Sequence, residues 1–322
     1  MMADYLLGDM PITSAPPLSL LRPRRAGPVA AILTVTRVPR PMRPRAVRAW
    51  RHQWQDDAKR TVISLTLTPS GYLLRFPRKC DFAISSDARR IDARPHRHVA
   101  PEFLEHLLAD QVLPRCLAQQ GELVVHAAGI ALGPDIALFV GESGRGKSTL
   151  AGLFFRTGRT LLSDDCLILR PTPEAVRAVP TYPSLRLRPD SVDALFPGDA
   201  ALAPLPSYSD KPRFSIPDVS RQAAAGRVAA VYFLGDADAG RTDVRIAPMA
   251  RATACIRLME QSFQLDILDR EAVQRLLGLA GEVVARVPVF TLDYPRDFGR
   301  AAELVAGIER HFAGVAGGSS AA

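Results

Sequence analysis

The segment GESGRGKS at residues 141–148 constrains this chain more than any other feature, because it fits G-x-x-x-x-G-K-[ST] at every required position. An apolar stretch at 136–140 precedes it, and a segment of helical character follows at 147–156. Glycines permit conformations that turn backbone N–H groups inward, and the start of the following helix adds partial positive charge. The sequence therefore predicts a strand, a phosphate-binding loop and a helix within an α/β domain.

Each part of this loop has an expected role. Lys147 can reach the β- and γ-phosphates of a nucleoside triphosphate, and the Ser148 hydroxyl can ligate Mg²⁺. The expected cofactors are therefore ATP and Mg²⁺. The other positions expected to surround the nucleotide are Gly141, Glu142, Ser143, Gly144, Arg145, Gly146 and Thr149.

Two adjacent carboxylates, Asp164 and Asp165, follow a short apolar strand predicted at 160–162. Neighbouring side chains at the end of a strand point in different directions, so the two can serve different purposes. One is expected to hold Mg²⁺ or its water shell, and the other to accept the proton of an attacking hydroxyl. A turn or a helix cap is the structural alternative, and the nearby phosphate loop favours the functional interpretation.

A single histidine, His126, lies on the apolar strand predicted at 122–132, before the loop. Strand alternation places it on the same face as Val124 and Ala128. A lone histidine among small apolar neighbours is more often a core residue than a functional one, so the residue pattern alone leaves both interpretations open.

Composition divides the rest of the chain. Residues 1–60 carry most of the net charge of +8 and are predicted to be a basic, Pro- and Arg-rich leader, partly disordered. An arm that binds an acidic partner or nucleic acid is the alternative, but the leader alone does not predict a nucleic-acid-binding protein. A small β-rich module is predicted over 61–99, the phosphate-loop domain over 100–313 and a disordered tail over 314–322. Predicted strands lie at 61–68, 72–76, 81–85, 228–234 and 289–293, and predicted helices at 101–119, 248–260, 270–285 and 296–312.

The cysteines do not indicate a metal site or a disulfide framework. Cys80, Cys116, Cys166 and Cys255 stand alone, without a second cysteine or a histidine at zinc-site spacing, and are expected to be small buried apolar residues. No apolar run approaches the roughly 20 residues that a membrane-spanning helix needs. We therefore expect a cytoplasmic protein without a membrane partner.

The segment VVHAAGIALGPDIALFVGESGRGKSTLAGLFFRTGRTLLSDD at 124–165 resembles the catalytic core of the HPr kinase/phosphorylase family. That family has a histidine on the strand before the loop, then G-x-S-G-x-G-K-S, a helix, a glycine and a strand that ends in Asp-Asp. The resemblance implies that Asp164 is the base toward a serine hydroxyl, and beside it Asp165 is expected to support either the metal or the geometry of the site. It also implies that His126 contacts the reacting phosphate or Asp164. The implied fold is a P-loop core shared with ATP-type phosphoenolpyruvate carboxykinases, with a mixed sheet.

The chain departs from that family in the region after Asp165. The segment LRLRP at 185–189 has arginine where the family has a metal-binding glutamate, and the family's later loop with glycine and arginine has no counterpart. Lys211 and Arg213 are candidates for phosphate-binding cations, with a solvated basic turn as the alternative.

The chain more closely resembles the shorter HPr-kinase-like proteins, which include kinases that phosphorylate a serine of a lasso-type peptide. The resulting hypothesis is an ATP-dependent serine kinase acting on a peptide or protein, with a lasso-type precursor favoured. The alternative is a nucleotide-binding regulatory module without phosphoryl transfer. Members of the family often assemble, so a homo-oligomer stays open.

Overall fold

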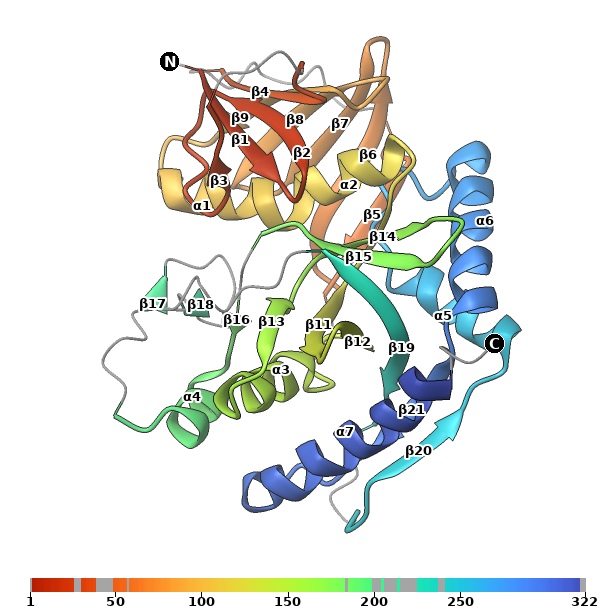
Figure 1. Cartoon of the computed structure of the whole chain (residues 1–322). Coiled ribbons are helices and arrows are strands. Elements are labelled where there is room, and N and C mark those ends of the chain that lie inside the picture. The colour runs from red at the N-terminus through yellow and green to blue at the C-terminus, as the bar shows by residue number, and fades with distance from the viewer. Residues whose placement is uncertain are drawn as a thin grey trace. The chain divides into compact units, whose positions relative to one another are not determined.

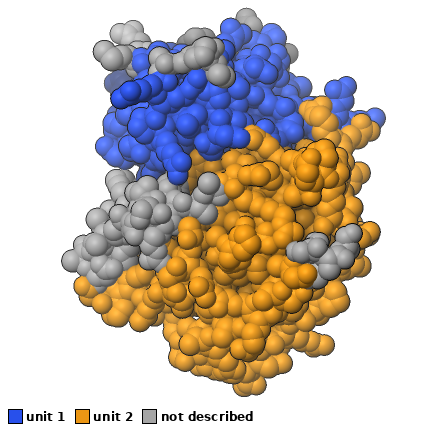
Figure 2. All heavy atoms as spheres, viewed as in Figure 1, with its two compact units in different colours: residues 1–122, 264–273 blue, residues 123–263, 274–322 orange. Residues whose placement is uncertain are grey.

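The computed structural model describes residues 2–25, 30–38, 49–56, 58–182, 185–198, 204–205, 213–214, 225–236 and 241–318. The chain forms two compact units, one of residues 1–122 and 264–273 and the other of residues 123–263 and 274–322 (Figures 1 and 2). Each unit has its own nine-stranded mixed sheet. The prediction of an α/β fold with a mixed sheet is confirmed.

The first unit is built on a sheet with the strand order β3-β1-β2-β4-β9-β8-β7-β6-β5. The pairs β2–β4 and β4–β9 are parallel, and the remaining neighbours are antiparallel. Its strands are β1 (Ala3–Leu7), β2 (Met10–Ser14), β3 (Arg22–Pro23), β4 (Leu33–Arg37), β5 (His52–Gln55), β6 (Thr61–Thr68), β7 (Gly71–Phe76), β8 (Cys80–Ser85) and β9 (Arg90–Pro95).

The helical segment of the first unit follows the sheet in sequence and is bonded to it. It consists of α1 (Pro101–Leu107), a π-helical turn (Leu108–Val112) and α2 (Leu113–Gln119). Gln119 Nε2 donates to Tyr72 Oη at 3.2 Å, and Ser19 Oγ donates to the buried carboxylate of Glu105 at 3.0 Å. Apolar residues of this segment such as Leu104, Leu108 and Val112 are buried, so the segment adds to the core of this unit.

The structure differs here from the domain boundaries predicted from composition. Much of the predicted leader over 1–60 forms strands β1–β5, because buried residues such as Leu33 and Val35 alternate with partly exposed threonines. The Pro- and Arg-rich part at 39–48 lies outside the described residues. The helical segment 101–119, which was predicted to open the phosphate-loop domain, belongs to the first unit.

The second unit is built on a sheet with the path β10-β14-β15-β19-β12-β11-β13, extended by β21 and β20 beside β19. The pairs β12–β19 and β19–β21 are parallel, and the other pairs are antiparallel. Its strands are β10 (Leu123–Val125), β11 (Ala127–Leu132), β12 (Asp135–Val140), β13 (Thr160–Ser163), β14 (Leu167–Pro171), β15 (Val176–Pro180), β19 (Gly226–Leu234), β20 (Arg245–Pro248) and β21 (Val289–Asp293). A small separate sheet joins β16 (Leu185–Arg186), β17 (Pro204–Leu205) and β18 (Arg213–Phe214).

Apolar clusters cover both faces of this sheet. On β12, Ala137 and Phe139 join one cluster, whereas Ile136, Leu138 and Val140 join the other, as the period of two in a strand requires. The first cluster contains residues of α3 (Lys147–Arg156), α4 (Pro189–Leu195) and α7 (Ala301–Gly318), and the second contains residues of α5 (Arg251–Glu260) and α6 (Arg270–Arg286). The strand that leads into the phosphate-loop sequence is therefore buried on both sides.

The C-terminal segment also differs from its prediction. Helix α7 continues to Gly318, although a disordered tail was predicted from residue 314, because Val315 and Ala316 pack against the first apolar cluster and offset the low helix propensity of the glycines in this stretch. Residues 319–322 lie outside the described residues. None of the helices in the described ranges combines the length and the apolar character that crossing a membrane requires.

Candidate functional site

The carboxyl ends of three neighbouring parallel strands bring the site together. Strands β12, β19 and β21 are parallel, so the segments that follow them emerge at the same edge of the sheet. These segments are the loop at 141–146, Gly235 and the segment 294–298. No sequence motif pointed to Gly235 or to the segment 294–298.

The loop has the backbone geometry that its glycines were expected to provide. Gly144 and Gly146 have φ angles of 88° and 87°, in the left-handed region that favours glycine. Gly146 is the N-cap of α3, and its carbonyl oxygen accepts a hydrogen bond from the backbone N–H of Leu150 at 2.9 Å. The loop therefore ends at a helix N-terminus, which favours bound anions.

Lys147 is buried, with 4% of its surface exposed, and lies against the loop. Its Nζ donates to the carbonyl oxygens of Gly141 at 2.5 Å and Glu142 at 3.0 Å. These bonds hold the ammonium group inside the loop, where it was predicted to meet phosphate oxygens.

A cavity of about 290 Å³ opens beside the loop. Of the residues predicted to bind the nucleotide, Ser143, Gly144, Gly146, Lys147, Ser148 and Thr149 line it. His126 and Arg186 line it as well, and the segment after β21 closes another side. The remaining lining residues are Leu153, Arg188, Asp190, Ser191, Tyr294, Pro295, Arg296, Asp297, Phe298 and Leu304.

Three predicted loop residues are not among those lining the cavity: Gly141, Glu142 and Arg145. Arg145 Nη2 pairs with the Glu142 carboxylate at 2.7 Å, and Arg145 also pairs with Asp236. The hydrogen bond from Arg145 holds the pKa of Glu142 below its usual range. The structure thus places the side chains of Glu142 and Arg145 in surface ion pairs.

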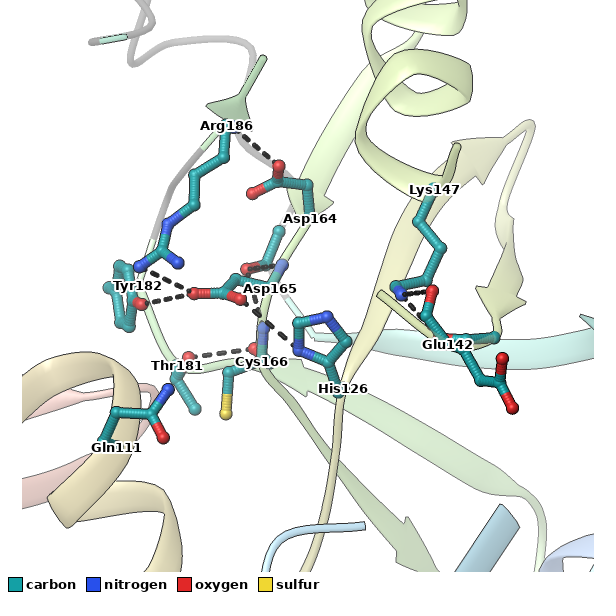
Figure 3. A network of polar contacts seen from close by, with 12 residues as sticks. Gln111, His126, Glu142, Lys147, Asp164, Asp165, Cys166, Thr181, Tyr182 and Arg186 are labelled. Atoms are coloured by element: carbon teal, nitrogen blue, oxygen red, sulfur yellow. Dashed lines mark hydrogen bonds and ion pairs between the residues drawn. The ribbon is translucent and has the colours of Figure 1, made fainter. Parts of the chain in front are cut away.

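The two aspartates after β13 are buried and make different contacts, as Figure 3 shows. Asp164 Oδ2 accepts the backbone N–H of Arg186 at 2.6 Å. Asp165 Oδ2 accepts the Tyr182 hydroxyl at 3.1 Å and lies 3.3 Å from Arg186 Nη2. The two carboxylates therefore contact different groups, and neither aspartate is among the residues lining the cavity. Their roles as base and metal ligand stay predictions.

His126 occupies the single position between β10 and β11, so the strand predicted over 122–132 is divided there. Its Nδ1 lies 3.4 Å from Asp165 Oδ1, and about a third of its side chain is exposed. The resemblance implied a contact with Asp164 or the phosphate, whereas the structure pairs this histidine with Asp165. A carboxylate that bonds one ring nitrogen orients the ring and leaves the other nitrogen for a ligand.

The residues present fit Mg²⁺ only in part. Mg²⁺ in nucleotide sites is bound by one or two protein ligands together with phosphate oxygens, and the Ser148 hydroxyl in the cavity wall suits that role. Asp165, the other predicted ligand, already contacts Tyr182, Arg186 and His126. The described residues contain no group of three or more His, Cys, Asp or Glu side chains arranged to hold a metal.

The segment after β21 supplies site residues that the sequence did not identify. A helix was predicted from residue 296, but residues 294–297 precede a 3-10 turn (Phe298–Arg300), in which the Asp297 carboxylate accepts the N–H of Gly299 at 2.8 Å. Tyr294 is buried, and burial raises the pKa of its hydroxyl to about 12. The signal that could have found this segment is its place directly after a buried strand in a parallel sheet.

The two basic residues predicted after the arginine-containing segment cannot be placed in the site. Lys211 lies outside the described residues, and of Arg213 only the backbone in β18 is described. Their role as phosphate-binding cations stays a prediction.

No family model matches the sequence, and no curated protein matches it. Among solved structures, the chain is similar to the Hpr(Ser) kinase/phosphatase from Coxiella burnetii, with 13% sequence identity and a TM-score of 0.30, over 59% of this chain and 93% of that chain. A likeness at this TM-score does not establish a shared fold, so the function has to be inferred from the residues of this chain.

Proposed function

We propose that this protein is an ATP-dependent serine kinase that phosphorylates a peptide or protein. The observation that carries the proposal is one cavity lined by Lys147 and Ser148 of the loop and also by His126 and Arg186. The last two side chains both contact Asp165. A phosphate-binding loop and a histidine–carboxylate pair therefore meet at one site.

The charges around the cavity favour a nucleoside triphosphate. Basic side chains outnumber carboxylates among the lining residues. The basic residues are Lys147, Arg186, Arg188 and Arg296, and the acidic residues are Asp190 and Asp297. A positively charged concave surface attracts polyphosphate. Leu153, Phe298 and Leu304 add apolar surface to the same lining, which suits a nucleobase.

In the proposed reaction, the serine Oγ forms a bond to the γ-phosphorus while the bond between that phosphorus and the bridging oxygen of ADP breaks. The hydroxyl proton passes to Asp164, the proposed base, and His126 and Arg186 contact the transferred group. Mg²⁺ held by the phosphates and Ser148 would neutralise part of the negative charge. The lasso-type precursor as acceptor rests on the sequence resemblance alone.

One observation favours the alternative of a regulatory module that binds nucleotide without transfer. Asp164 is only 2% exposed, and it is not among the residues that line the cavity. A base must reach the hydroxyl that it deprotonates, directly or through one water. The kinase proposal therefore requires the acceptor serine to reach the buried Asp164 carboxylate, which accepts the backbone N–H of Arg186.

The test is transfer of label from γ-labelled ATP, with Mg²⁺, to a serine-containing precursor peptide. We expect Asp164→Asn to lower transfer at least about a hundredfold, the usual loss when an acid–base group is removed, and to leave ATP affinity within about threefold. Asp193→Asn, at an exposed position of α4, is the matched control and should retain activity. Equal loss of ATP binding in Asp164→Asn would contradict the base role. ATP binding by the wild type without transfer to peptide, carrier protein or free serine would support the regulatory module instead.

A further inference from the structure

Arg296 lies at the phosphate loop although no motif in the sequence points to it. It follows β21 by three residues, and it lines the cavity together with Gly146, Lys147 and Ser148. A Cβ atom built on Gly146 would lie only 2.7 Å from Arg296 Nη1. The guanidinium group therefore packs directly on the last glycine of the loop.

Contacts on two sides fix the position of this guanidinium group. Arg296 Nη2 donates to the carbonyl oxygen of Gly235 at 3.1 Å, and the group lies over the Tyr294 ring, 3.8 Å from its centroid. Tyr294 is itself buried, with 4% of its surface exposed, so the ring cannot move away easily. A planar cation held in this way loses little conformational freedom when it binds an anion.

The other terminal nitrogen of the guanidinium group, Nη1, differs from Nη2. It is shielded from solvent and makes no hydrogen bond of good geometry within the described residues. The Tyr294 hydroxyl lies against the same glycine, and the charge of Arg296 acts to lower the pKa of that hydroxyl, so Nη1 has a polar neighbour but no well-placed acceptor. Within the same residues, no carboxylate forms an ion pair with Arg296, and the adjacent Asp297 carboxylate accepts the N–H of Gly299. A buried charged donor without an acceptor is costly and rare, so its presence in a cavity wall indicates a ligand atom at that point.

We propose that Arg296 binds the polyphosphate chain of the nucleotide, as a cation supplied by the segment after β21. The proposal rests on the proposed nucleotide binding at this loop and adds a residue that the loop motif does not contain. Phosphate oxygens that accept the N–H groups around Gly146 come within reach of Nη1, since both lie against the same glycine. Arg296 lies against Gly146 at the end of the loop, whereas the Lys147 ammonium group is hydrogen-bonded to Gly141 and Glu142 at its start. In this proposal the two cations bind the phosphate chain together.

The test measures equilibrium binding of two ligands, ATP and inorganic tripolyphosphate, to the full-length protein. Tripolyphosphate presents the phosphate chain without base or ribose. We expect Arg296→Met to weaken binding of both ligands by about tenfold or more, which is the usual loss of a hydrogen bond to a charged group. Arg296→Lys should recover part of the loss because it keeps the charge but not the planar fork. Arg245→Met, at an exposed position of the neighbouring strand β20, is the matched control and should bind like the wild type.

The outcomes separate this proposal from the one on which it rests. If the wild type binds neither ligand, both proposals are wrong. If the wild type binds both ligands and Arg296→Met, still folded by circular dichroism, binds them equally well, only the role of Arg296 is wrong. Weaker binding of ATP with unchanged binding of tripolyphosphate would assign Arg296 to the base or ribose and overturn the phosphate contact.

Discussion

At the residue scale, one carboxylate, that of Asp165, contacts three other polar side chains near the cavity. Asp165 receives contacts from His126, between β10 and β11, and from Tyr182 and Arg186, which lie close together in the sequence (Figure 3). Such a network fixes the orientation of the side chains that do reach the cavity. Of the two roles predicted for Asp165, these contacts suit support of the site geometry, and the metal-binding role stays a prediction.

A partly exposed histidine in the second unit, His311, gives a prediction about pH. His311 Nδ1 lies 3.0 Å from the Tyr232 hydroxyl, and burial lowers the pKa of His311 below its ordinary value of 6.5. Below pH 6.5 the unfolded chain therefore takes up a proton at this histidine before the folded protein does. We expect the free energy of unfolding to fall as the pH drops below about 6.5, down to the lowered pKa. His311→Gln should flatten this part of the curve, measured by urea unfolding between pH 5 and 7.

The control for this prediction is His98→Gln, at an exposed position, which should keep the pH dependence of the wild type. An unchanged pH dependence in His311→Gln would show that His311 does not contribute to it.

The site residues divide into those that the sequence could predict and those that it could not. The loop, the Asp-Asp pair and His126 are recognisable because their spacing along one segment carries the signal. Tyr182 and Arg296 reach the site through hydrogen bonds to residues 17 and 61 positions away, and no local pattern marks such contacts. They become visible only when the strand order of the sheet is known.

At the scale of elements, the periodicity of apolar residues predicted the types of the helices and strands well, but it predicted their ends less accurately. The three strands predicted over 61–85 agree with β6, β7 and β8, because alternation and turn residues are local properties. The strand predicted over 122–132 is two strands, since β10 pairs with β14 whereas β11 pairs with β12 and β13. A change of partner at His126 does not alter the alternation, so the sequence could not reveal it.

Glycines in a turn and in a helix are expected to respond to alanine in opposite ways. Gly71 has a φ of 139°, and a Cβ there would lie 2.2 Å from the carbonyl oxygen of Ile84. Gly71→Ala should lower the free energy of unfolding by about 1–3 kcal/mol or more, because neither the backbone nor the neighbour can yield cheaply. Gly278 lies in α6 with open space around it, so Gly278→Ala should raise stability by roughly 0.5–1 kcal/mol. Thermal unfolding of both variants beside the wild type checks the pair, and a stabilised Gly71→Ala would contradict the turn geometry.

At the scale of the whole molecule, the first unit contains a segment that composition could not assign to it. Residues 264–273 join residues 1–122, and the Asp266 carboxylate pairs with Arg51 Nε at 2.7 Å across 215 positions of the chain. Asp269 accepts a hydrogen bond from Gln119 at 2.8 Å in the same unit. Composition marks where polar and apolar segments alternate, but it does not mark which distant segments share a core. The predicted boundaries at residues 60 and 100 therefore did not match the two units.

The central claim, that the cavity beside the loop binds ATP, is tested most directly by hydrogen–deuterium exchange of the full-length protein with and without ATP and Mg²⁺. We expect slower amide exchange at 141–149 and at 294–298 when ATP is present, because residues of both segments line the cavity. Lys147→Ala should abolish the change in both segments, since it removes the ammonium group that lies inside the loop. Unchanged exchange in both segments of the wild type at saturating ATP would show that the cavity beside the loop does not bind ATP.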